Sequence, residues 1–413
     1  MARTILTTLV ALATAALLFL AGGSSTNGCL WDSDTLRTEA SGAPGMVETI
    51  VGRFDRYPPL YYEMRLDRVT KELATDPADH LRNLAAYDDA GVACDRLGRH
   101  DEAIAWMARK RVSLDALADS EAKAEHEYRY LANLGTFHAH RWIAAGADRS
   151  DMADIERARD LIAQAIELNP DAHFGREHFQ LAVLEWILEL PQDPTPEGDL
   201  AYIRPDQTEG FYILHLTDLG QRADGPEGVA GLVALGNAWN SFDVFFSLGL
   251  ALNSHAHNSL AHLARLRAKE IADAGGRSLH AGADLSTFDP DDHVRSIDER
   301  QQAAVEAFYT QARAEADAWH AARTQYIMAR LEQGRHPDTH PDFFAAWVEP
   351  SSMPALPNGF LGIATITDDL IRAIVIGIAV LAVLLLVALS AATRFYRRRA
   401  EADGPERPAP TTA

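Results

Sequence analysis

Closely spaced histidines are the first residues of this 413-residue sequence whose types and spacing could do chemistry. Residues 126–130 read "HEYRY" and begin like the zinc-binding motif of metalloproteases, in which two histidines four positions apart bind one ion from a single helix face. Tyr130 stands where the second histidine is required. His138 and His140 are two positions apart and therefore point to different helix faces. Neither segment has the ligand pattern of a zinc site.

No other arrangement of reactive side chains is complete. The segments "HFGREH" (173–178) and "HAH" (255–257) have no supporting cysteine or carboxylate pattern. Cys94 falls on the packing face of a predicted helix, where cysteine is usually a small buried hydrophobe. The adjacent Asp88 and Asp89 diverge by about 100° around a helix and do not share a site. We therefore predict no catalytic residues, no metal and no cofactor, so a binding surface is the remaining candidate for function.

The helices that carry these residues contain a recurring pattern of small side chains. Residues 87–110, "YDDAGVACDRLGRHDEAIAWMARK", have the periodicity of two amphipathic helices joined by a glycine-containing turn. Gly91 in the first helix and Ala103 in the second are twelve positions apart. Small residues at such positions let two helices approach almost to backbone contact. The segment therefore predicts a tight helical hairpin.

Two further copies of this hairpin follow along the chain. The predicted packing residues of the three copies are Gly91, Ala103, Gly135, Ala158, Ala165, Gly249, Ala261 and Ala268. The step from glycine to the first alanine is twelve residues in the third copy, as in the first, but twenty-three in the second. We therefore predict an insertion over residues 144–154 at the tip of the second hairpin.

These positions resemble those of the tetratricopeptide repeat (TPR) family. The resemblance covers residues 84–117, 128–171 and 242–275. It implies an all-α fold in which helical hairpins stack into a solenoid over residues 59–275. Two residues depart from the family pattern, because Lys110 stands where a second alanine is expected and Arg265 where phenylalanine is expected.

The resemblance also implies where a protein partner would bind. In TPR proteins, polar positions on the first helix of each hairpin line a concave groove that holds an extended peptide or a partner helix. Carried over to this sequence, those positions are Asp88, Asp95, Arg96, Asn133, His140, Arg141 and Asn253. Asn133 matches the asparagine with which the family binds a peptide backbone. The alternative is that these are ordinary solvated helix positions. We expect Asn133→Ala together with Arg96→Ala to weaken partner binding without changing thermal stability.

Single helices flank and connect the hairpins. A capping helix is predicted from Pro59, which suits the first turn of a helix, to the residue before Pro77. One helix each is predicted for residues 174–190 and 229–239, and turns for residues 191–199 and 222–228. The terminal repeats of a solenoid need such a cap, because their outer face has no neighbour.

A long helix is predicted over residues 297–333, ending at Gly334, within a capping region that spans residues 276–350. Apolar or small residues recur in it every seven positions, at Val305, Ala312, Trp319 and Tyr326. Such a stripe could form a coiled coil with another chain. Glu315 interrupts the stripe and alanine is frequent, so we favour packing against the last hairpin.

Both ends of the sequence have the composition of membrane signals. Residues 1–23 predict a signal peptide, with an uncleaved anchor and a lipid on Cys29 as alternatives. Residues 371–392 predict one transmembrane helix, because they contain an uncharged run of about twenty residues. Arginines follow this run, so the positive-inside rule places the basic, disordered tail (393–413) in the cytoplasm and the bulk of the chain outside, in the periplasm. The segments between these signals and the helical region are residues 24–58 and 351–370.

Charge and cysteine content narrow the choice of partner. The formal net charge of −21 argues against nucleic acid, and two cysteines exclude a disulfide framework. We therefore predict a membrane-tethered, extracytoplasmic TPR-like scaffold that binds protein partners through its groove and is not an enzyme. The alternative is an accessory subunit of an envelope enzyme or assembly machinery, for example in cytochrome maturation or cell-wall assembly, with the chemistry in the partner.

Overall fold

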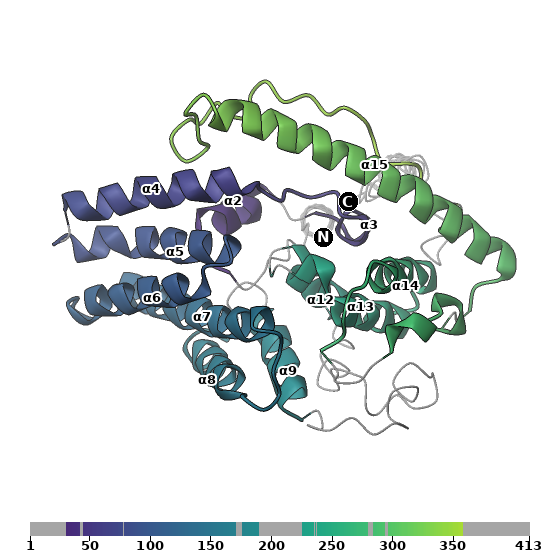
Figure 1. The fold of residues 1–413 in the computed structure, drawn as a ribbon, viewed down its shortest axis with the longest axis horizontal. Coiled ribbons are helices and arrows are strands. Elements are labelled where there is room, and N and C mark those ends of the chain that lie inside the picture. Colours follow the sequence, from purple (N-terminus) through teal and green to yellow (C-terminus); the bar gives the residue numbers. More distant parts are fainter. Residues whose placement is uncertain are drawn as a thin grey trace, which may run out of the picture. The chain divides into compact units, whose positions relative to one another are not determined.

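The computed structural model describes residues 30–41, 44–76, 78–170, 176–189, 225–234, 236, 238–279, 284–293 and 296–357. Throughout these ranges the regular elements are helices and there is no strand, which confirms the predicted all-α fold (Figure 1). No helix in the same ranges is both long and apolar enough to cross a membrane. The predicted signal peptide (1–23), Cys29, the predicted transmembrane helix (371–392) and the tail (393–413) lie outside the described residues.

Helices follow one another along the described chain, several of them with a recognisable start. The α-helices are α2 (Ser33–Ser41), α3 (Met46–Val51), α4 (Pro59–Thr75), α5 (His80–Arg96), α6 (His100–Asp115), α7 (Glu121–Ala144), α8 (Ala153–Leu168), α9 (Arg176–Glu189), α12 (Gly225–Ala234), α13 (Phe242–Ser254), α14 (Asn258–Asp273) and α15 (Glu299–Leu331). Short 3₁₀ helices are η2 (Ala238–Asn240), η3 (Leu285–Thr287) and η4 (Pro290–His293). Side chains of Asp79, Ser120, Ser241 and Asp298 accept a backbone hydrogen bond from the first turn of α5, α7, α13 and α15.

Three pairs of consecutive helices pack along their lengths as hairpins: α5 with α6, α7 with α8, and α13 with α14. A Cβ atom at Gly135 would lie 3.2 Å from the carbonyl oxygen of Ala158, and one at Gly249 would lie 3.1 Å from that of Ala261. At Gly91 the nearest atom would be Cε of Met107 at 2.8 Å. The predicted packing alanines Ala103, Ala158, Ala165, Ala261 and Ala268 are fully buried. A side chain at any of the three glycines would therefore collide with a neighbouring helix.

The second hairpin keeps its glycine–alanine contact despite its greater length. α7 continues to Ala144, and residues 145–152 connect it to α8, whereas three residues connect the helices of each of the other hairpins. The indole N–H of Trp142 donates to two carbonyl oxygens of the long connection, each at 3.0 Å. The inserted residues are therefore an extension of α7 followed by a loop tied to the helix end.

The single helices predicted between the hairpins are present, with one correction. α4 and α9 lie within the ranges predicted for them. The turn predicted over residues 222–228 is wrong for its second half, because Gly225 to Gly228 form the first turn of α12. Proline is accepted in the first turn of a helix, and the absence of a side chain at Gly228 leaves room for Phe179 of α9. α12 then ends at Ala234, short of the predicted end.

The long helix α15 contacts more than the last hairpin. It packs against α14 and also against α3 and α4 (Figure 1). Near its end, Ile327 and Leu331 pack with Tyr61 and Tyr62 of α4. The helix has 33 residues, so it is about 50 Å long. It stops before Gly334, whose φ of +75° is the left-handed conformation that suits glycine.

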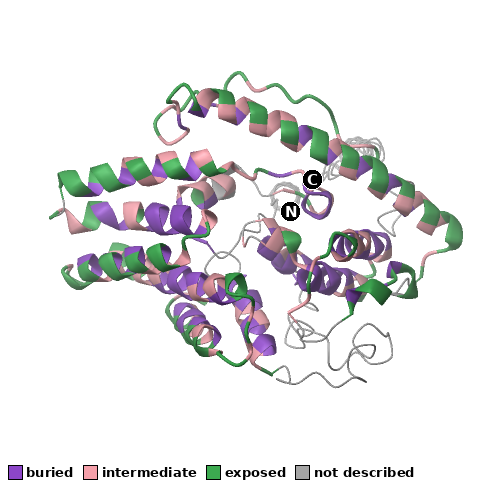
Figure 2. Ribbon diagram, in the orientation of Figure 1, coloured by how far each residue is buried: buried purple, intermediate pink, exposed green. Residues whose placement is uncertain are grey.

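Consecutive helices contact one another, and the last long helix contacts the first. Each of α4 to α9 contacts the next, α9 contacts α12, and the succession continues through α13 and α14 to α15, which touches α4 again. Buried residues concentrate on the hairpins and α12, while exposed residues are frequent along α4 and α15 (Figure 2). An open solenoid has contacts only between neighbouring repeats. Here the first and last long helices of the described chain also support each other.

Candidate functional site

One side of α7 faces away from its hairpin partner α8. Asn133, Thr136, His140 and Ile143 are three or four residues apart, so they lie on the same side of the helix. We call these residues the inner face of α7. Asn133 binds residues 30–41, which we call the N-terminal segment, and the other three line a cavity.

The carboxamide of Asn133 binds the backbone of the N-terminal segment at two points. Its Oδ1 accepts a hydrogen bond from the N–H of Trp31 at 2.7 Å, and its Nδ2 donates to the carbonyl oxygen of the same residue at 3.0 Å. Nδ2 also donates to Oδ1 of Asp88 at 3.0 Å. Two bonds to one residue fix the register of a chain without using its side chain. The binding partner of Asn133 in the structure is thus the protein's own chain.

The side chains of the N-terminal segment are part of the core. Leu30 and Trp31 are buried, and the ring of Trp31 meets that of Tyr128 edge-on with centroids 5.6 Å apart. Oδ1 of Asp32 accepts the backbone N–H of Thr35 at 2.9 Å and so caps α2. The N-terminal segment therefore consists of two buried apolar residues, Leu30 and Trp31, followed by the short helix α2.

Arg65 of α4 holds the N-terminal segment from the other side. Its buried guanidinium donates to Asp32 and Asp34 of the segment and to Asp338, which follows α15, over distances of 2.7 to 3.0 Å. Burial raises the pKa of Asp32 to about 7, with the Asp34 charge acting in the same direction and Arg65 opposing it. Arg65 opposes the effect of burial more successfully at Asp34 and Asp338, so the pKa values of these two carboxyls lie below their usual range. The network joins both ends of the described chain to α4.

Lys110 forms a buried ion pair. Its Nζ lies 2.6 and 2.7 Å from the two carboxylate oxygens of Asp88, and both side chains are buried. Burial would raise the pKa of Asp88, but Lys110 and His126 outweigh it and hold the pKa below its usual range. Asp88 was predicted as a groove residue, yet its carboxylate is occupied by Lys110 and Asn133 and is not exposed to a ligand.

A second buried carboxylate, Asp95, holds two histidines at the cavity. His140 Nδ1 lies 2.9 Å from Oδ2, and His100 Nδ1 lies 3.0 Å from Oδ1. Burial would raise the pKa of Asp95, but His140, His100 and Arg96 outweigh it and keep the pKa well below its usual range. Both imidazoles line the cavity, so Asp95 fixes their orientation from behind.

The cavity has a volume of about 390 Å³ and lies among α7, α9, α12 and α13. Its apolar lining includes Ala139, Ile143, Val183, Leu184, Ile187 and Leu232. Its polar lining includes His100, His140, Gln180, Asp243 and Arg277. Besides the two histidines, which bond to Asp95 through Nδ1, Gln180 donates to Thr136 at 2.9 Å, and Asp243 accepts the N–H of Leu279 at 2.8 Å. The arrangement suits an apolar side chain of a ligand, with the histidines available to a polar group beside it.

The remaining predicted binding residues lie away from the cavity lining. Arg141 donates to Asp154 at 2.8 Å and to Asp101 at 2.7 Å, so it joins the tips of two hairpins. Arg96 is half-buried, and its charge acts on Tyr62 of α4. Asn253 has both amide atoms buried without a hydrogen-bond partner among the described residues. Of the predicted set, the structure thus pairs Asn133 with Asp88 and His140 with Asp95, and it does not bring these three other residues to either pair.

Sequence reasoning missed two features. The N-terminal segment was given no structure, although an apolar pair directly before the capping Asp32 was an available signal. The second feature is His262, Asp291 and Glu306, the one group of histidine, cysteine and carboxylate side chains in the described ranges whose ligand atoms are close enough to share an ion. These residues come from three separate elements, so no local spacing indicates them.

Comparisons of the chain with protein-family models, with curated proteins and with solved structures found no match.

Proposed function

We propose that this chain is a membrane-tethered, extracytoplasmic scaffold of TPR type that binds an extended segment of a partner protein along the inner face of α7. The observation that carries the proposal is the pair of hydrogen bonds between Asn133 and the backbone of Trp31. They demonstrate one contact in which this helix face holds a peptide backbone. The backbone of a partner segment would bind in the same way nearer the cavity end of the inner face of α7.

The cavity provides the room for that partner. The N-terminal segment bonds to the Asn133 end of the inner face, and His140 and Ile143 continue the face into the cavity. A volume of about 390 Å³ lies within the range of ligand pockets and accommodates one or two side chains. Leu184 and Ile187 of α9 would enclose an apolar side chain, and His140 would meet a polar group of the partner.

The TPR assignment is supported by the three hairpins and their glycine contacts. In each hairpin the glycine of the first helix packs against the second helix, as the family spacing requires. The membrane tether is supported by the apolar run within residues 371–392 and the arginines after it.

A reporter fused after Ala413 tests the topology. We expect it to be active as a cytoplasmic reporter, and we expect protease added from outside to degrade the helical region. Activity of the fused reporter only outside the membrane would reverse the orientation.

A photo-crosslinking residue at position 143 tests the binding surface. The side chain of Ile143 lines the cavity and is 43% exposed, and Val112 of α6 is a matched control because it is 66% exposed and does not line the cavity. We expect a discrete crosslinked protein from position 143 and none from position 112. Equal products from both positions, or none from position 143, would contradict the proposal. The identity of the crosslinked protein also separates a scaffold from an accessory subunit of an enzyme.

A further inference from the structure

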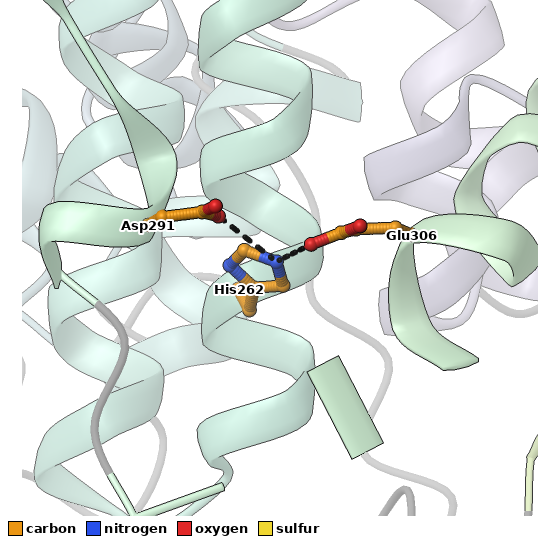
Figure 3. Close-up of side chains that lie close together, drawn as sticks. All are labelled: His262, Asp291 and Glu306. Carbon is orange, nitrogen blue, oxygen red and sulfur yellow. Dashed lines mark ion pairs between the residues drawn. The ribbon is translucent and has the colours of Figure 1, made fainter. Parts of the chain in front are cut away.

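A histidine and two carboxylates meet where the last hairpin joins α15. His262 belongs to α14, Asp291 to η4 and Glu306 to α15. Nε2 of His262 lies 3.9 Å from Oδ1 of Asp291 and 3.6 Å from Oε1 of Glu306 (Figure 3). The nearest ligand atoms of all three residues lie within 4.8 Å of one another. The two carboxylates approach the ring from different elements and from different sides (Figure 3).

His262 is unusual among the described histidines because it is fully buried and unsatisfied. Its exposed fraction is 0%, and neither ring nitrogen has a hydrogen-bond partner among the described residues. Both carboxylate distances are too long for hydrogen bonds. A buried polar group without a partner is destabilising by about 1–3 kcal/mol. Among the described residues, the polar contacts of the ring are therefore the two long ion pairs of Nε2 with Asp291 and Glu306.

We propose that His262, Asp291 and Glu306 bind a divalent transition-metal ion, with Zn²⁺ as the best match. Zn²⁺ bonds histidine nitrogen and carboxylate oxygen at about 2.0–2.2 Å, which places neighbouring ligands of a tetrahedral ion about 3.4 Å apart. The nitrogen–oxygen distances of 3.6 and 3.9 Å are slightly longer than this, and the two carboxylate oxygens, which lie within 4.8 Å of each other, would also have to approach. An octahedral Mg²⁺ ion needs ligands about 3.0 Å apart and prefers oxygen.

The protonation state of the ring agrees with this assignment. Burial lowers the pKa of His262, against the opposing charges of Asp291 and Glu306. A metal ligand must be the neutral imidazole, so burial keeps the ring in the form that binds. The two carboxylates would neutralise the charge of the ion, and three protein ligands leave one position of a tetrahedral ion open to water or to another ligand.

The ion would tie α15 to the last hairpin. α15 already contacts α14 through hydrogen bonds, among them Gln301 to Ser259 at 2.8 Å and Arg313 to Glu270 at 3.1 Å. A bond from His262 through the ion to Glu306 would add a link between the same two helices. Ion binding to the folded chain but not to the unfolded chain raises the melting temperature.

Calorimetric titration of the purified, chelator-treated full chain with Zn²⁺ alone tests the site. Glu306→Gln and Asp291→Asn change partly exposed side chains and retain their size, so the fold should persist, which circular dichroism checks. Asp292→Asn is the matched control, because Asp292 is an exposed carboxylate on the same 3₁₀ helix and not a member of the group. We expect each ligand variant to weaken Zn²⁺ binding by about tenfold or more, and the control to leave it unchanged.

Two further measurements separate this site from adventitious binding to surface histidines. Co²⁺ should give visible absorption bands in the wild-type chain that are lost in Glu306→Gln, and excess Mg²⁺ should not displace it. Zn²⁺ should raise the melting temperature of the wild-type chain and of Asp292→Asn, but not of Glu306→Gln. Equal Zn²⁺ affinity in the wild-type chain and Glu306→Gln, or no uptake by the wild-type chain, would overturn the proposal.

Discussion

The two halves of the inner face of α7 are built from the same helix but have different surroundings. At Asn133 the N-terminal segment covers the face, and every polar atom of the carboxamide contact is engaged within the chain. At His140 and Ile143 the face lines a cavity, and the side chain of Ile143 is 43% exposed. The first half is therefore part of the core, and the second half is the part open to a ligand.

This difference shows that a position carried over from a sequence resemblance does not by itself identify a binding residue. The sequence resemblance predicts Asn133 as a peptide-binding residue, but in the structure it binds the backbone of Trp31 in the same chain. His140, two turns along the same face, retains access to the cavity. Four substitutions or conditions distinguish the covered half from the open half.

Arg65→Met should have the largest effect, because it removes the cation that holds the N-terminal segment over the covered half. Asp32, Asp34 and Asp338 would be left buried without their shared partner. We expect a loss of about 3–5 kcal/mol in the free energy of unfolding, measured by urea denaturation. Arg82→Met, at an exposed position of α5, should change it little. Similar midpoints for both variants would refute the structural role of Arg65.

Asn133→Ala should lower the free energy of unfolding by about 2–3 kcal/mol, because it removes two buried hydrogen bonds to the backbone of Trp31. The sequence-based expectation is that Asn133→Ala together with Arg96→Ala leaves stability unchanged, but the full burial of Asn133 argues against it. Gln180→Ala removes one hydrogen bond at the cavity and should be clearly less destabilising. If both variants lose the same free energy of unfolding, the covered and open halves do not differ in their contribution to stability.

The stability of the covered half should fall as the pH rises, through Asp32. Its folded pKa of about 7 lies above the ordinary value of 3.8, so the folded state binds the proton more tightly than the unfolded state. The stabilisation from this proton is complete below the pKa of Asp32 in the unfolded state. It is lost as the pH rises through the pKa of Asp32 in the folded state. Between pH 5 and pH 7 the wild-type chain should lose about 2 kcal/mol relative to Asp32→Asn, measured as the difference of urea midpoints. Parallel pH profiles of the two chains would contradict this role.

Ile143→Asp should have the smallest effect on folding and the largest on binding. The side chain is partly exposed at the cavity, so the free energy of unfolding should change by only about 0.5 kcal/mol. A photo-crosslink to a partner from position 183, another lining residue, should be lost because the charge lies in the apolar part of the cavity. Val112→Asp serves as the control and should leave both measurements unchanged. Retention of the crosslink in Ile143→Asp would remove the cavity from the proposed binding surface.

Patterns within one hairpin made part of this fold predictable from the sequence. Gly135 and Ala158 are close in the chain, and small residues in two amphipathic helices have few other ways to be buried. Pro59 at the start of α4 and Gly334 after α15 mark helix ends through their own backbone preferences. These are local properties, and they required no knowledge of distant residues.

Contacts between distant residues were not predictable in the same way. Trp31 and Asn133 are 102 residues apart, and nothing in either local sequence specifies the other. The group of His262, Asp291 and Glu306 depends on how α15 returns along α14. The glycine and proline of residues 225–228 have turn-like composition, but the close approach of Phe179 decides in favour of a helix.

The bonds between Arg65 and Asp338 have a consequence for how the chain acquires its structure. The two residues are 273 positions apart, so this contact has a high contact order and is expected to form late. At synthesis rates of about 5–20 residues per second, Asp338 is made roughly 14–55 s after Arg65. The hairpins of α5 to α8 are complete well before then, with Arg65 lacking one of its acceptors. The N-terminal segment therefore reaches its final stability only after the last long helix has been synthesised.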